Sequence, residues 1–264
     1  MNLREPDTAQ PIIDYSMLES RFASLRDEYE HADPFPYIII DNFFSEQLAR
    51  RAAGAFPLFA KKRMAQLLEA RAYGGGLDAD PVFREMFDAL HGPEFTRWLE
   101  RLTGIPTLVG DTELVGAGLH QGARGSFLHL HADHNTHPRD DSRYRRVNVL
   151  VYMNRVWEAG WNGDLQLWDR DGATCRKTVT PAFNRCVIME VNDEAFHGYG
   201  RLRIPPGETR KLLAAYYYAD HSGRRQSQAP HGTILRHPRN ESVLSRFDHA
   251  LRRAVLWRLE RPKN

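Results

Sequence analysis

Hydrophobic positions in the first hundred residues recur every three or four residues, which is the spacing of one face of an amphipathic helix. This pattern predicts a helix over residues 14–31 and a second over residues 45–56, where Ser45 suits the N-cap. Two further helices are expected over residues 81–90 and 93–102, each with a proline in its first turn. The apolar positions of the first helix are Met17, Leu18, Phe22, Leu25 and Tyr29.

After Gly104 the chain changes to short runs of β-branched and aromatic residues, separated by Gly, Asp and Asn turns as far as Ala219. A short strand over residues 37–40 precedes them, and Gly74-Gly75-Gly76 predicts a flexible loop. Short strands with frequent turns indicate an antiparallel sandwich or barrel. Because the helices come first, we expect them to pack on one side of a sheet. The later strands are expected at residues 107–115, 127–131, 147–153, 165–168, 186–191 and 212–218.

The two ends of the chain differ from its middle. Residues 1–13 predict a loose arm, and the basic, turn-rich stretch 221–237 predicts a linker or lid. From Asn240 onward, apolar residues share one face of a final helix, which must pack on the core or on a second subunit, so a homodimer through this helix is one expectation. The expected organisation is a helical support with an entry strand (1–106), a β-rich catalytic core in the same domain (107–220), and a basic linker with a C-terminal helix (221–264).

Composition narrows the class of protein. The chain has 264 residues, of which 36 are basic and 34 acidic, and 42 % are hydrophobic, as is typical of a globular protein with a sizeable core. The near-balanced charge argues against nucleic-acid binding as a function, and apolar runs such as Tyr37–Ile40 are too short for a bilayer. The start of the chain lacks a signal-peptide apolar region. Cys175 and Cys186 predict no disulfide framework, so we expect a cytoplasmic protein.

The first candidate chemistry lies in the sequence Leu128-His129-Leu130-His131-Ala132-Asp133. If this stretch ends a strand, alternation places His129, His131 and Asp133 on one face, so two ligands can reach one ion. Two histidines and one carboxylate form the facial triad of non-heme Fe(II) oxygenases, which leaves coordination positions open. A polar, solvent-facing strand is the alternative. His129 competes with His131 as the ligand, but no carboxylate follows His129 two residues on.

Three further positions could complete a site. His197 follows an apolar strand and precedes a glycine, which suits a third metal ligand as well as an ordinary turn. Arg210 and Lys211 enter a buried strand facing opposite ways, so one cation points inward and needs a partner, for which a guanidinium matches a carboxylate; an exposed arginine at a strand start is the alternative. Tyr152 lies in a mostly buried strand and can either donate its hydroxyl to a ligand or serve as a core aromatic.

These motifs occur in a fixed order over roughly residues 108–220. They are H-x-D, then R-R-V-N-V-L-V-Y-M-N from Arg145, L-x-L-W-D from Leu165, N-R-C-V, F-H-G and T-R-K. The ordered set resembles the prolyl-hydroxylase-like family of 2-oxoglutarate/Fe(II) oxygenases, and residues 34–43 resemble the family's entry strand. The resemblance implies a mainly β protein with flanking helices: a double-stranded β-helix, which is a jelly-roll or cupin-like fold, with the N-terminal helices packed on one sheet.

The resemblance also implies a metal site and a co-substrate site. By motif position, the Fe(II) ligands are His131, Asp133 and His197. The residues that bind 2-oxoglutarate are Arg210 and Tyr152, which meet its distal carboxylate, together with Asn148 and Leu150. With O2, these cofactors imply hydroxylation of an unactivated C–H bond and release of succinate and CO2. Asp133 favours hydroxylation, since related halogenases lack the carboxylate.

The substrate expected from the resemblance is a prolyl residue of a protein or peptide, and a free amino acid or small biosynthetic intermediate is the alternative. The sequence departs from the family at Asn162, where a glycine is usual, but asparagine takes the same turn conformation. A second departure is the insert at residues 134–145, which is a candidate for substrate contact. Its His134 and His137 are expected in a loop, without metal contact.

Three rival functions are weaker. A non-catalytic jelly-roll binding module would be expected to have lost a triad residue or Arg210, and all are present. A zinc-dependent barrel enzyme would show more His or Glu ligands and no buried arginine. A nucleic-acid dealkylating oxygenase could use the basic stretch 224–236, but the balanced charge and the lack of aromatic-basic alternation argue against it.

Overall fold

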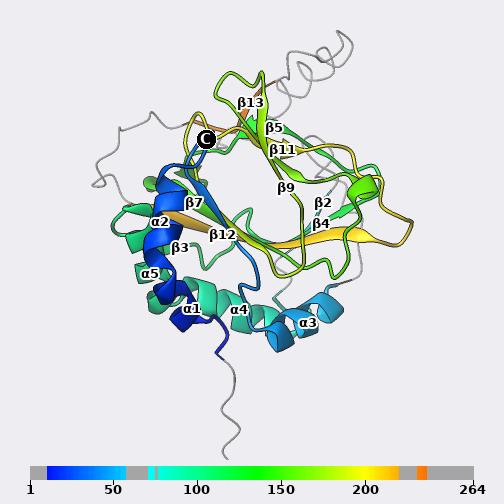
Figure 1. Cartoon of the computed structure of the whole chain (residues 1–264), viewed down its shortest axis with the longest axis horizontal. Helices are drawn as coiled ribbons and strands as arrows, with labels where there is room; N and C mark the ends of the chain where they lie inside the picture. The colour runs from blue at the N-terminus through cyan, green and yellow to red at the C-terminus, as the bar shows by residue number, and fades with distance from the viewer. Residues whose placement is uncertain (1–10, 58–70, 75–76, 220–230, 237–264) are drawn as a thin grey trace, which may run out of the picture.

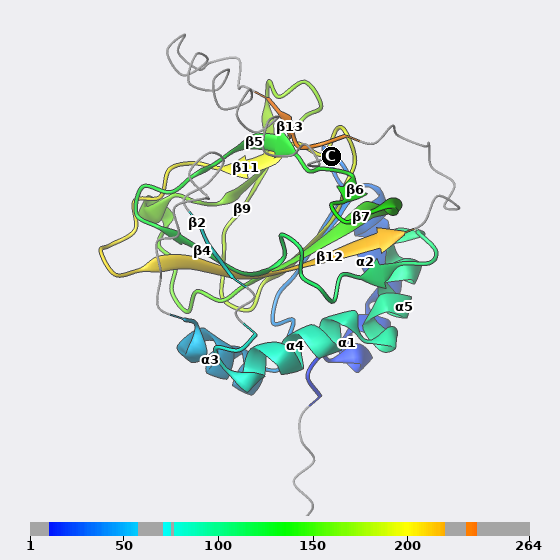
Figure 2. The ribbon, with the colours of Figure 1, turned by 180° about the vertical axis from the view of Figure 1, so that it is seen from behind.

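The computed structural model describes residues 11–57, 71–74, 77–219 and 231–236. Two antiparallel sheets face each other, and the helices cover the outer face of the larger sheet (Figures 1 and 2). The predicted fold class, a double-stranded β-helix with N-terminal helices on one sheet, is confirmed. No helix in these residues is long and apolar enough to cross a membrane.

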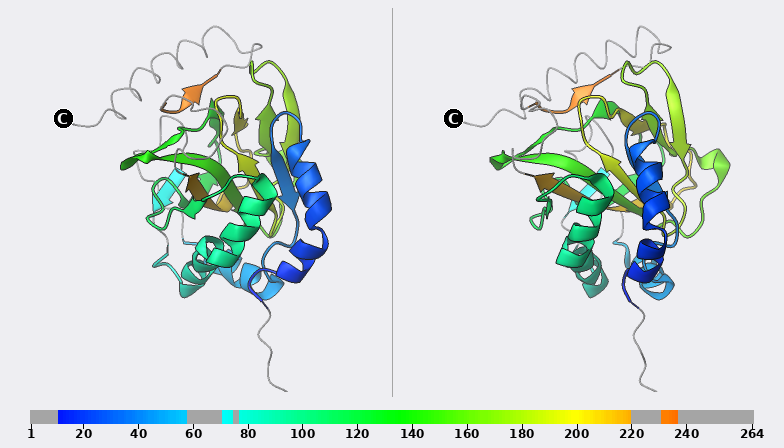
Figure 3. Two further views of the ribbon diagram at one scale, coloured as in Figure 1. Left: turned by 90° about the vertical axis from the view of Figure 1, so that its left-hand side faces the viewer. Right: turned by 60° about the vertical axis from the view of Figure 1, so that its left-hand side comes forward.

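The helices are α1 (Tyr15–Ser20), α2 (Phe22–Glu30), α3 (Glu46–Ala55), α4 (Pro81–His91) and α5 (Pro93–Thr103), with a 3-10 turn η2 (Ala159–Trp161). The strands are β1 (Tyr37–Ile40), β2 (Arg71–Gly74), β3 (Val109–Gly110), β4 (Gly118–Ala123), β5 (Leu128–Ala132), β6 (Thr136–His137), β7 (Asp140–Tyr152), β8 (Leu165–Trp168), β9 (Cys175–Val179), β10 (Cys186–Glu190), β11 (His197–Tyr199), β12 (Thr209–Ala219) and β13 (Ile234–Leu235). The large sheet has the order β1-β10-β7-β12-β4-β2, and β3 and β6 pair with β12 and β7. The small sheet has the order β13-β5-β11-β8-β9. In Figure 3, β13 (orange) lies at the opposite end of the molecule from α3 and α4.

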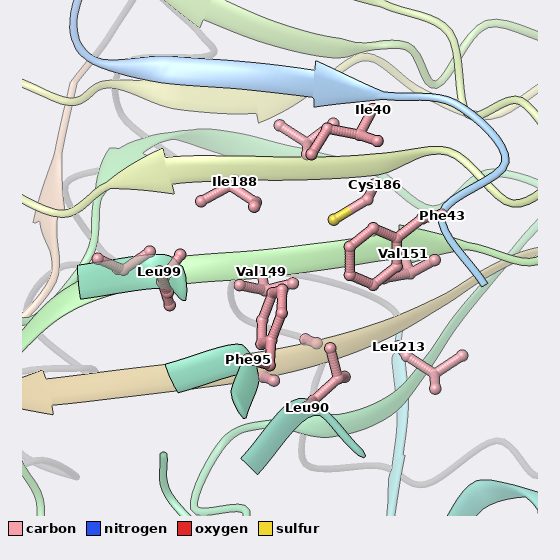
Figure 4. Close-up of a cluster of buried hydrophobic side chains, with 14 of the residues drawn as sticks. Ile40, Phe43, Leu90, Phe95, Leu99, Val149, Val151, Cys186, Ile188 and Leu213 are labelled. Atoms are coloured by element: carbon pink, nitrogen blue, oxygen red, sulfur yellow. The ribbon is translucent and has the colours of Figure 1, made fainter. Parts of the chain in front are cut away.

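The outer face of the large sheet forms the main core with the helices. Alternating residues of β7, such as Val149 and Val151, are fully buried there, because a strand covered on both faces needs apolar side chains on the helical side. They lie in one cluster with side chains from α4, α5 and the neighbouring strands (Figure 4). The labelled members of that cluster are Ile40, Phe43, Leu90, Phe95, Leu99, Val149, Val151, Cys186, Ile188 and Leu213. The opposite face of β7 is therefore left to the space between the sheets.

Capping residues set several helix ends. The Asp80 carboxylate accepts a hydrogen bond from Val82 N at 2.8 Å ahead of α4, and Pro81 occupies the first turn, as expected for an N-cap and a first-turn proline. Gly104 ends α5 in the left-handed conformation with a φ of 69°, which glycine adopts at little cost. Two sequence expectations need correction: the first predicted helix is broken at Arg21 into α1 and α2, and Ser45 precedes α3 without a side-chain cap.

The strand predictions are correct where the alternation was strong and wrong elsewhere. The predicted strand over residues 107–115 shrinks to β3, because the Asp111 carboxylate takes the amides of Glu113 and Val115 at 3.1 and 2.7 Å and folds the rest into a turn. Within the insert over residues 134–145, His134 lies in a loop as expected, but His137 lies in β6, which forms a hairpin with the first part of β7.

Other segments were missed or lie outside the described residues. The prediction of a loose arm over residues 1–13 is wrong for Ile13, which is buried and forms a β-bridge with Phe44. Gly74 ends β2 rather than a loop, and part of the predicted linker is β13. The predicted C-terminal helix, from Asn240, lies outside the described residues. The strands that were not predicted are β2, β4, β6, β9, β11 and β13.

Candidate metal centre and its cavity

Three candidate ligands converge on two neighbouring inner strands of the small sheet, β5 and β11. His131 on β5 and His197 on β11 are directly paired across the two strands, and Asp133 follows β5. One ligand atom from each residue lies within 4.8 Å of the other two. His131 Nε2 is 3.4 Å from one Asp133 carboxylate oxygen, and His197 Nε2 is 3.7 Å from the other. Antiparallel pairing thus joins two histidines that are far apart in the sequence.

Both imidazoles are oriented by backbone carbonyls. His131 Nδ1 lies 2.9 Å from the carbonyl of His129, and His197 Nδ1 lies 3.0 Å from the carbonyl of Ala195. A carbonyl can only accept, so Nδ1 of each neutral ring is the donor and Nε2 keeps its lone pair. Burial and the neighbouring His131 lower the pKa of His197 to about 4. That ring is therefore neutral near pH 7, the form that binds a metal.

A bulge in β5 decides which histidine faces the site. His197 pairs with His131, but Tyr199 pairs with Leu128, so a step of three residues on β5 lies opposite a step of two residues on β11. The extra residue breaks the alternation. Leu128 consequently lines the cavity beside His131, and His129 lies outside both the cavity and the ligand group. The expectation that His129 shares the face of His131 is wrong for this reason.

Gly198 allows the close approach of the two strands. A Cβ on Gly198 would lie 2.7 Å from the Leu128 carbonyl oxygen and 3.1 Å from that of His129. Any side chain there would push β11 away from β5 and separate His197 from His131. The glycine that follows the histidine in the F-H-G motif is thus explained by backbone packing.

The Asp133 carboxylate is held by two buried side chains from β7. Its Oδ2 accepts a hydrogen bond from Asn148 Nδ2 at 2.7 Å and lies 3.2 Å from Arg145 Nη2. Burial alone would raise the pKa of Asp133, but the Arg145 guanidinium beside it holds that pKa well below its usual value. The carboxylate is therefore ionised near neutral pH and available as an anionic ligand.

A second bulge turns Arg145 toward the site. Tyr217 pairs with Val147, but Tyr218 pairs with Arg145, so Arg146 is the extra residue on β7. Without it, Arg145 would share the face of Val147 and point toward the helices. Arg145 is instead buried above the Tyr216 ring, with its guanidinium carbon 3.3 Å from the ring centroid. Arg145 lies in the R-R-V-N-V-L-V-Y-M-N motif, but its sequence position alone indicates no role for it.

Arg210 has different surroundings from Arg145, although it is equally buried, at 4 % exposure. Its Nε donates to the Gly163 carbonyl at 2.9 Å, and its Nη2 donates to the Tyr152 hydroxyl at 3.1 Å. Within the described part of the chain, no carboxylate lies within ion-pairing distance of it. A buried guanidinium without an internal counter-ion is costly, so this position suits an external carboxylate.

All seven residues proposed from the sequence line one cavity of about 220 Å³ between the two sheets. They are His131, Asp133, His197, Asn148, Leu150, Tyr152 and Arg210. Residues that sequence reasoning missed also line it, among them Arg145, Tyr199, Tyr216 and Thr233. The pairing of the strands brings the candidate metal ligands and Arg210 into this single cavity. A pattern of motifs along the chain does not specify that pairing.

The two other histidines of the insert lie in different places. His134 lines the cavity, 3.5 Å from Arg145 through its Nε2, and burial with the Arg145 charge lowers its pKa to about 4. His137 lies in β6, where its Nε2 is 3.7 Å from the buried Asp111. Neither belongs to the metal-ligand group found among the described residues. The cavity position of His134 agrees with the insert as a candidate for substrate contact.

The turn before β8 orients Arg210. Asn162 has a φ of 59°, the conformation expected when asparagine replaces glycine, and Gly163 has a φ of 90°. The Asn162 amide donates to the Arg201 carbonyl at 2.9 Å. The carbonyl of the residue after Asn162, Gly163, accepts a hydrogen bond from Arg210 Nε. Local turn chemistry therefore fixes one end of the cavity.

Gly163→Ala is expected to lower the free energy of unfolding by about 1–3 kcal/mol and to weaken binding of a carboxylate ligand at Arg210. The new Cβ would overlap the Leu202 side chain, lie 3.1 Å from Trp157, and adopt a φ that disfavours any side chain. Chemical denaturation and ligand titration measure the two effects. Gly160→Ala is the control, since nothing lies within 4 Å of its Cβ position; equal effects of both substitutions would contradict this assignment of the turn.

The donor set fits a divalent metal with open coordination positions. Two Nε2 atoms with fixed tautomers and one ionised carboxylate can occupy one face of an octahedron, leaving three positions. The carbonyl partners of both Nδ1 atoms are the interactions that usually orient metal-bound histidines. Arg210, which has no counter-ion among the described residues, and the Tyr152 hydroxyl in the same cavity fit the carboxylate of a second ligand.

Comparison with known proteins agrees with this geometry. Residues 117–218 match the model of the 2OG-Fe(II) oxygenase superfamily. A prolyl 4-hydroxylase from Phytophthora capsici is similar over 95 % of this chain and 80 % of its own, with a TM-score of 0.53 and 20 % identity. A prolyl hydroxylase from Trichoplax adhaerens, solved with a peptide fragment of hypoxia inducible factor, has a TM-score of 0.51 and 16 % identity over 78 % of this chain and 93 % of its own.

A prolyl 4-hydroxylase from Pseudomonas putida has a TM-score of 0.50 and 18 % identity, and the match covers 75 % of this chain and 98 % of that one. Among curated proteins, no sequence matches this chain. At these identities the structural matches show the shared fold, and the match of residues 117–218 connects the cavity with a known class of metal chemistry.

Proposed function

We propose that this chain is a 2-oxoglutarate/Fe(II)-dependent dioxygenase of the prolyl 4-hydroxylase-like type, and that it hydroxylates an unactivated C–H bond in a peptide or protein side chain. The match of residues 117–218 to the 2OG-Fe(II) oxygenase superfamily supports the first part. One atom of O2 enters the substrate as hydroxyl. The other enters succinate as the C1–C2 bond of 2-oxoglutarate breaks and CO2 leaves. The observation that carries the proposal is a His–Asp–His group in one cavity with a buried arginine that has no counter-ion in the part of the chain the structure describes.

The residues of the chain divide the work. His131, Asp133 and His197 would hold Fe(II), which would supply O2 activation coupled to decarboxylation of the co-substrate. Arg210 binds the distal carboxylate of 2-oxoglutarate through its free guanidinium edge, and the Tyr152 hydroxyl, which already accepts from Arg210 at 3.1 Å, donates to the same carboxylate. Charge pairing and a fixed donor angle thereby set the position of the co-substrate.

Apolar side chains keep the reacting end dry. Leu150, Leu165 and Leu212 line the cavity beside the polar groups. Exclusion of water strengthens the Arg210–carboxylate interaction and protects a reactive centre from side reactions. Asn148 and Arg145 hold Asp133 in place through contacts with its Oδ2 atom. The protein therefore contributes orientation, charge and desolvation, as is usual for cofactor enzymes.

The size of the cavity supports a substrate that inserts one side chain. At about 220 Å³, it is smaller than the roughly 300–1,000 Å³ of pockets that enclose a drug-sized ligand, and it must also hold 2-oxoglutarate. We propose a prolyl residue of a peptide or protein as the substrate group, in line with the prolyl hydroxylases of the same fold. A free amino acid or small biosynthetic intermediate is the alternative, which the same small cavity also admits.

A substrate panel tests the proposal. We expect succinate release with Fe(II) and 2-oxoglutarate to be stimulated more by blocked proline-containing peptides than by free proline, by about tenfold in kcat/KM, because contacts remote from the reacting group add binding energy. Succinate and hydroxylated product are measured by mass spectrometry. Greater stimulation by a free amino acid would replace the peptide assignment with the alternative, and no succinate from any condition, uncoupled turnover included, would contradict the enzyme itself.

A further inference from the structure

The two oxygens of Asp133 have different surroundings. Oδ2 accepts from Asn148 Nδ2 at 2.7 Å and pairs with Arg145 Nη2 at 3.2 Å, whereas Oδ1 lies 3.4 Å from His131 Nε2. Yet Oδ2 is also only 3.7 Å from His197 Nε2. Both oxygens are therefore close enough to the imidazoles for the carboxylate to chelate an ion through both, unless one oxygen is otherwise engaged.

Arg145 fixes the amide that engages Oδ2. Its Nε donates to Asn148 Oδ1 at 2.8 Å, which leaves the Asn148 Nδ2 end facing Asp133. An amide bonded to a guanidinium at its oxygen cannot turn over without losing both contacts. Arg145 is itself fixed, since it is 2 % exposed and stacks on Tyr216. Each of the side chains of Arg145, Asn148 and Asp133 therefore contacts the other two.

From this arrangement we propose that Arg145 and Asn148 are positioning residues that restrict Asp133 to the metal through one oxygen. The inference rests on the proposed function, since it concerns the same metal. With one Asp133 oxygen and two imidazoles bound, an octahedral ion keeps three positions, enough for bidentate 2-oxoglutarate and O2. With both oxygens bound, it keeps two, and the co-substrate would leave none for O2.

The Arg145 charge acts in the same direction. The guanidinium offsets the Asp133 carboxylate, so a divalent ion, Asp133 and Arg145 together would present a net double positive charge to the dianionic co-substrate. The contrast between the two buried arginines supports this division of roles. Arg145 has an internal carboxylate, and Arg210 is bound by the Gly163 carbonyl and the Tyr152 hydroxyl.

Asn148→Leu removes the amide while keeping most of the volume. Apo protein is loaded with Mn(II), and water-proton relaxation counts the exchangeable waters on the metal before any co-substrate is added. We expect about three waters in the wild type and about two in the variant. The Kd for 2-oxoglutarate, measured anaerobically on the Fe(II) protein, is expected to rise about 10- to 100-fold. Substituting a residue that hydrogen-bonds to a metal ligand usually has an effect of this size on affinity or activity. The water count separates this role from a direct contact of Asn148 with the co-substrate.

Asn154→Leu is the matched control. Asn154 is a buried asparagine shortly after β7, and its amide forms hydrogen bonds with the backbone at Thr209 O and Lys211 N. It is expected to lose stability but keep about three waters. Arg145→Lys, which keeps the charge but lacks the planar fork that fixes the amide, is expected to show a water count between the wild type and Asn148→Leu. If Asn148→Leu does not fold, the smaller Asn148→Ser takes its place.

An unchanged water count in the Asn148 and Arg145 variants would overturn the inference while leaving the enzyme assignment intact. Failure of the wild-type protein to bind Mn(II) or Fe(II) would instead contradict the proposed function. Equal loss of waters in Asn154→Leu would show that the effect reflects general loosening of β7, and would also overturn the inference.

Discussion

Asp133→Ala is expected to abolish succinate formation and, at the same time, to lower the free energy of unfolding by about 3–5 kcal/mol. The first effect follows because the substitution removes the only carboxylate from the metal-ligand group. The second follows because Arg145, 2 % exposed and 3.2 Å from Asp133, would be left as an unpaired buried charge. Succinate assays and chemical denaturation measure the two quantities separately.

A double variant separates chemistry from stability. Asp133→Ala combined with Arg145→Met removes the buried charge together with its partner, and replacing both members of such a pair is often close to neutral for stability. We expect most of the lost unfolding free energy to return, whereas succinate formation stays absent. Succinate formation by the stable double variant would show that Asp133 is not a metal ligand.

Arg210→Met is expected to weaken 2-oxoglutarate binding by about 2–5 kcal/mol, which is about 30-fold to several-thousand-fold in Kd. The guanidinium is buried, oriented by the Gly163 carbonyl, and bonded to the Tyr152 hydroxyl. Because no carboxylate in the described residues neutralises it, the apo variant should be as stable as the wild type or more so. Anaerobic titration of the Fe(II) protein gives the Kd, and thermal denaturation gives the stability.

Two further variants calibrate that result. Tyr152→Phe removes one hydroxyl and keeps the ring, so a loss of about 1 kcal/mol, or about fivefold in Kd, is expected. Arg203→Met changes an exposed arginine on the segment before β12 and should leave the Kd unchanged. An Arg210→Met variant with the wild-type Kd would place the distal carboxylate elsewhere.

The sequence predicted the fold class and the family because the informative patterns are local. The alternation in β7 and β12, the H-x-D motif and the order of the later motifs can all be read from the sequence without knowing how the strands pair. The short strand β4 was missed because two glycines interrupt its pattern. One of them, Gly122, is needed because a Cβ there would lie 3.1 Å from Leu202 and 3.2 Å from the Tyr199 hydroxyl. Such a requirement depends on segments far away in the sequence.

The orientation of the site residues depends on two β-bulges, which the periodicity of hydrophobic residues does not predict. The bulge in β5 turns His129 away and brings Leu128 to the cavity, and the bulge at Arg146 turns Arg145 toward Asp133. Each shifts side chains from one face to the other by adding a single residue. Residue types and spacing therefore sufficed to propose the metal ligands, but the residues that orient them required the structure.

The central claim is that His131, Asp133, His197 and Arg210 hold one metal ion and one 2-oxoglutarate in a single cavity. A crystal structure of the anaerobic Fe(II)–2-oxoglutarate complex, with anomalous data at the iron edge, tests it most directly. We predict one iron peak within about 2.0–2.3 Å of both Nε2 atoms and of one Asp133 oxygen, and the distal carboxylate on Arg210. An iron peak away from these three residues, or 2-oxoglutarate bound without contact to Arg210, would contradict the account.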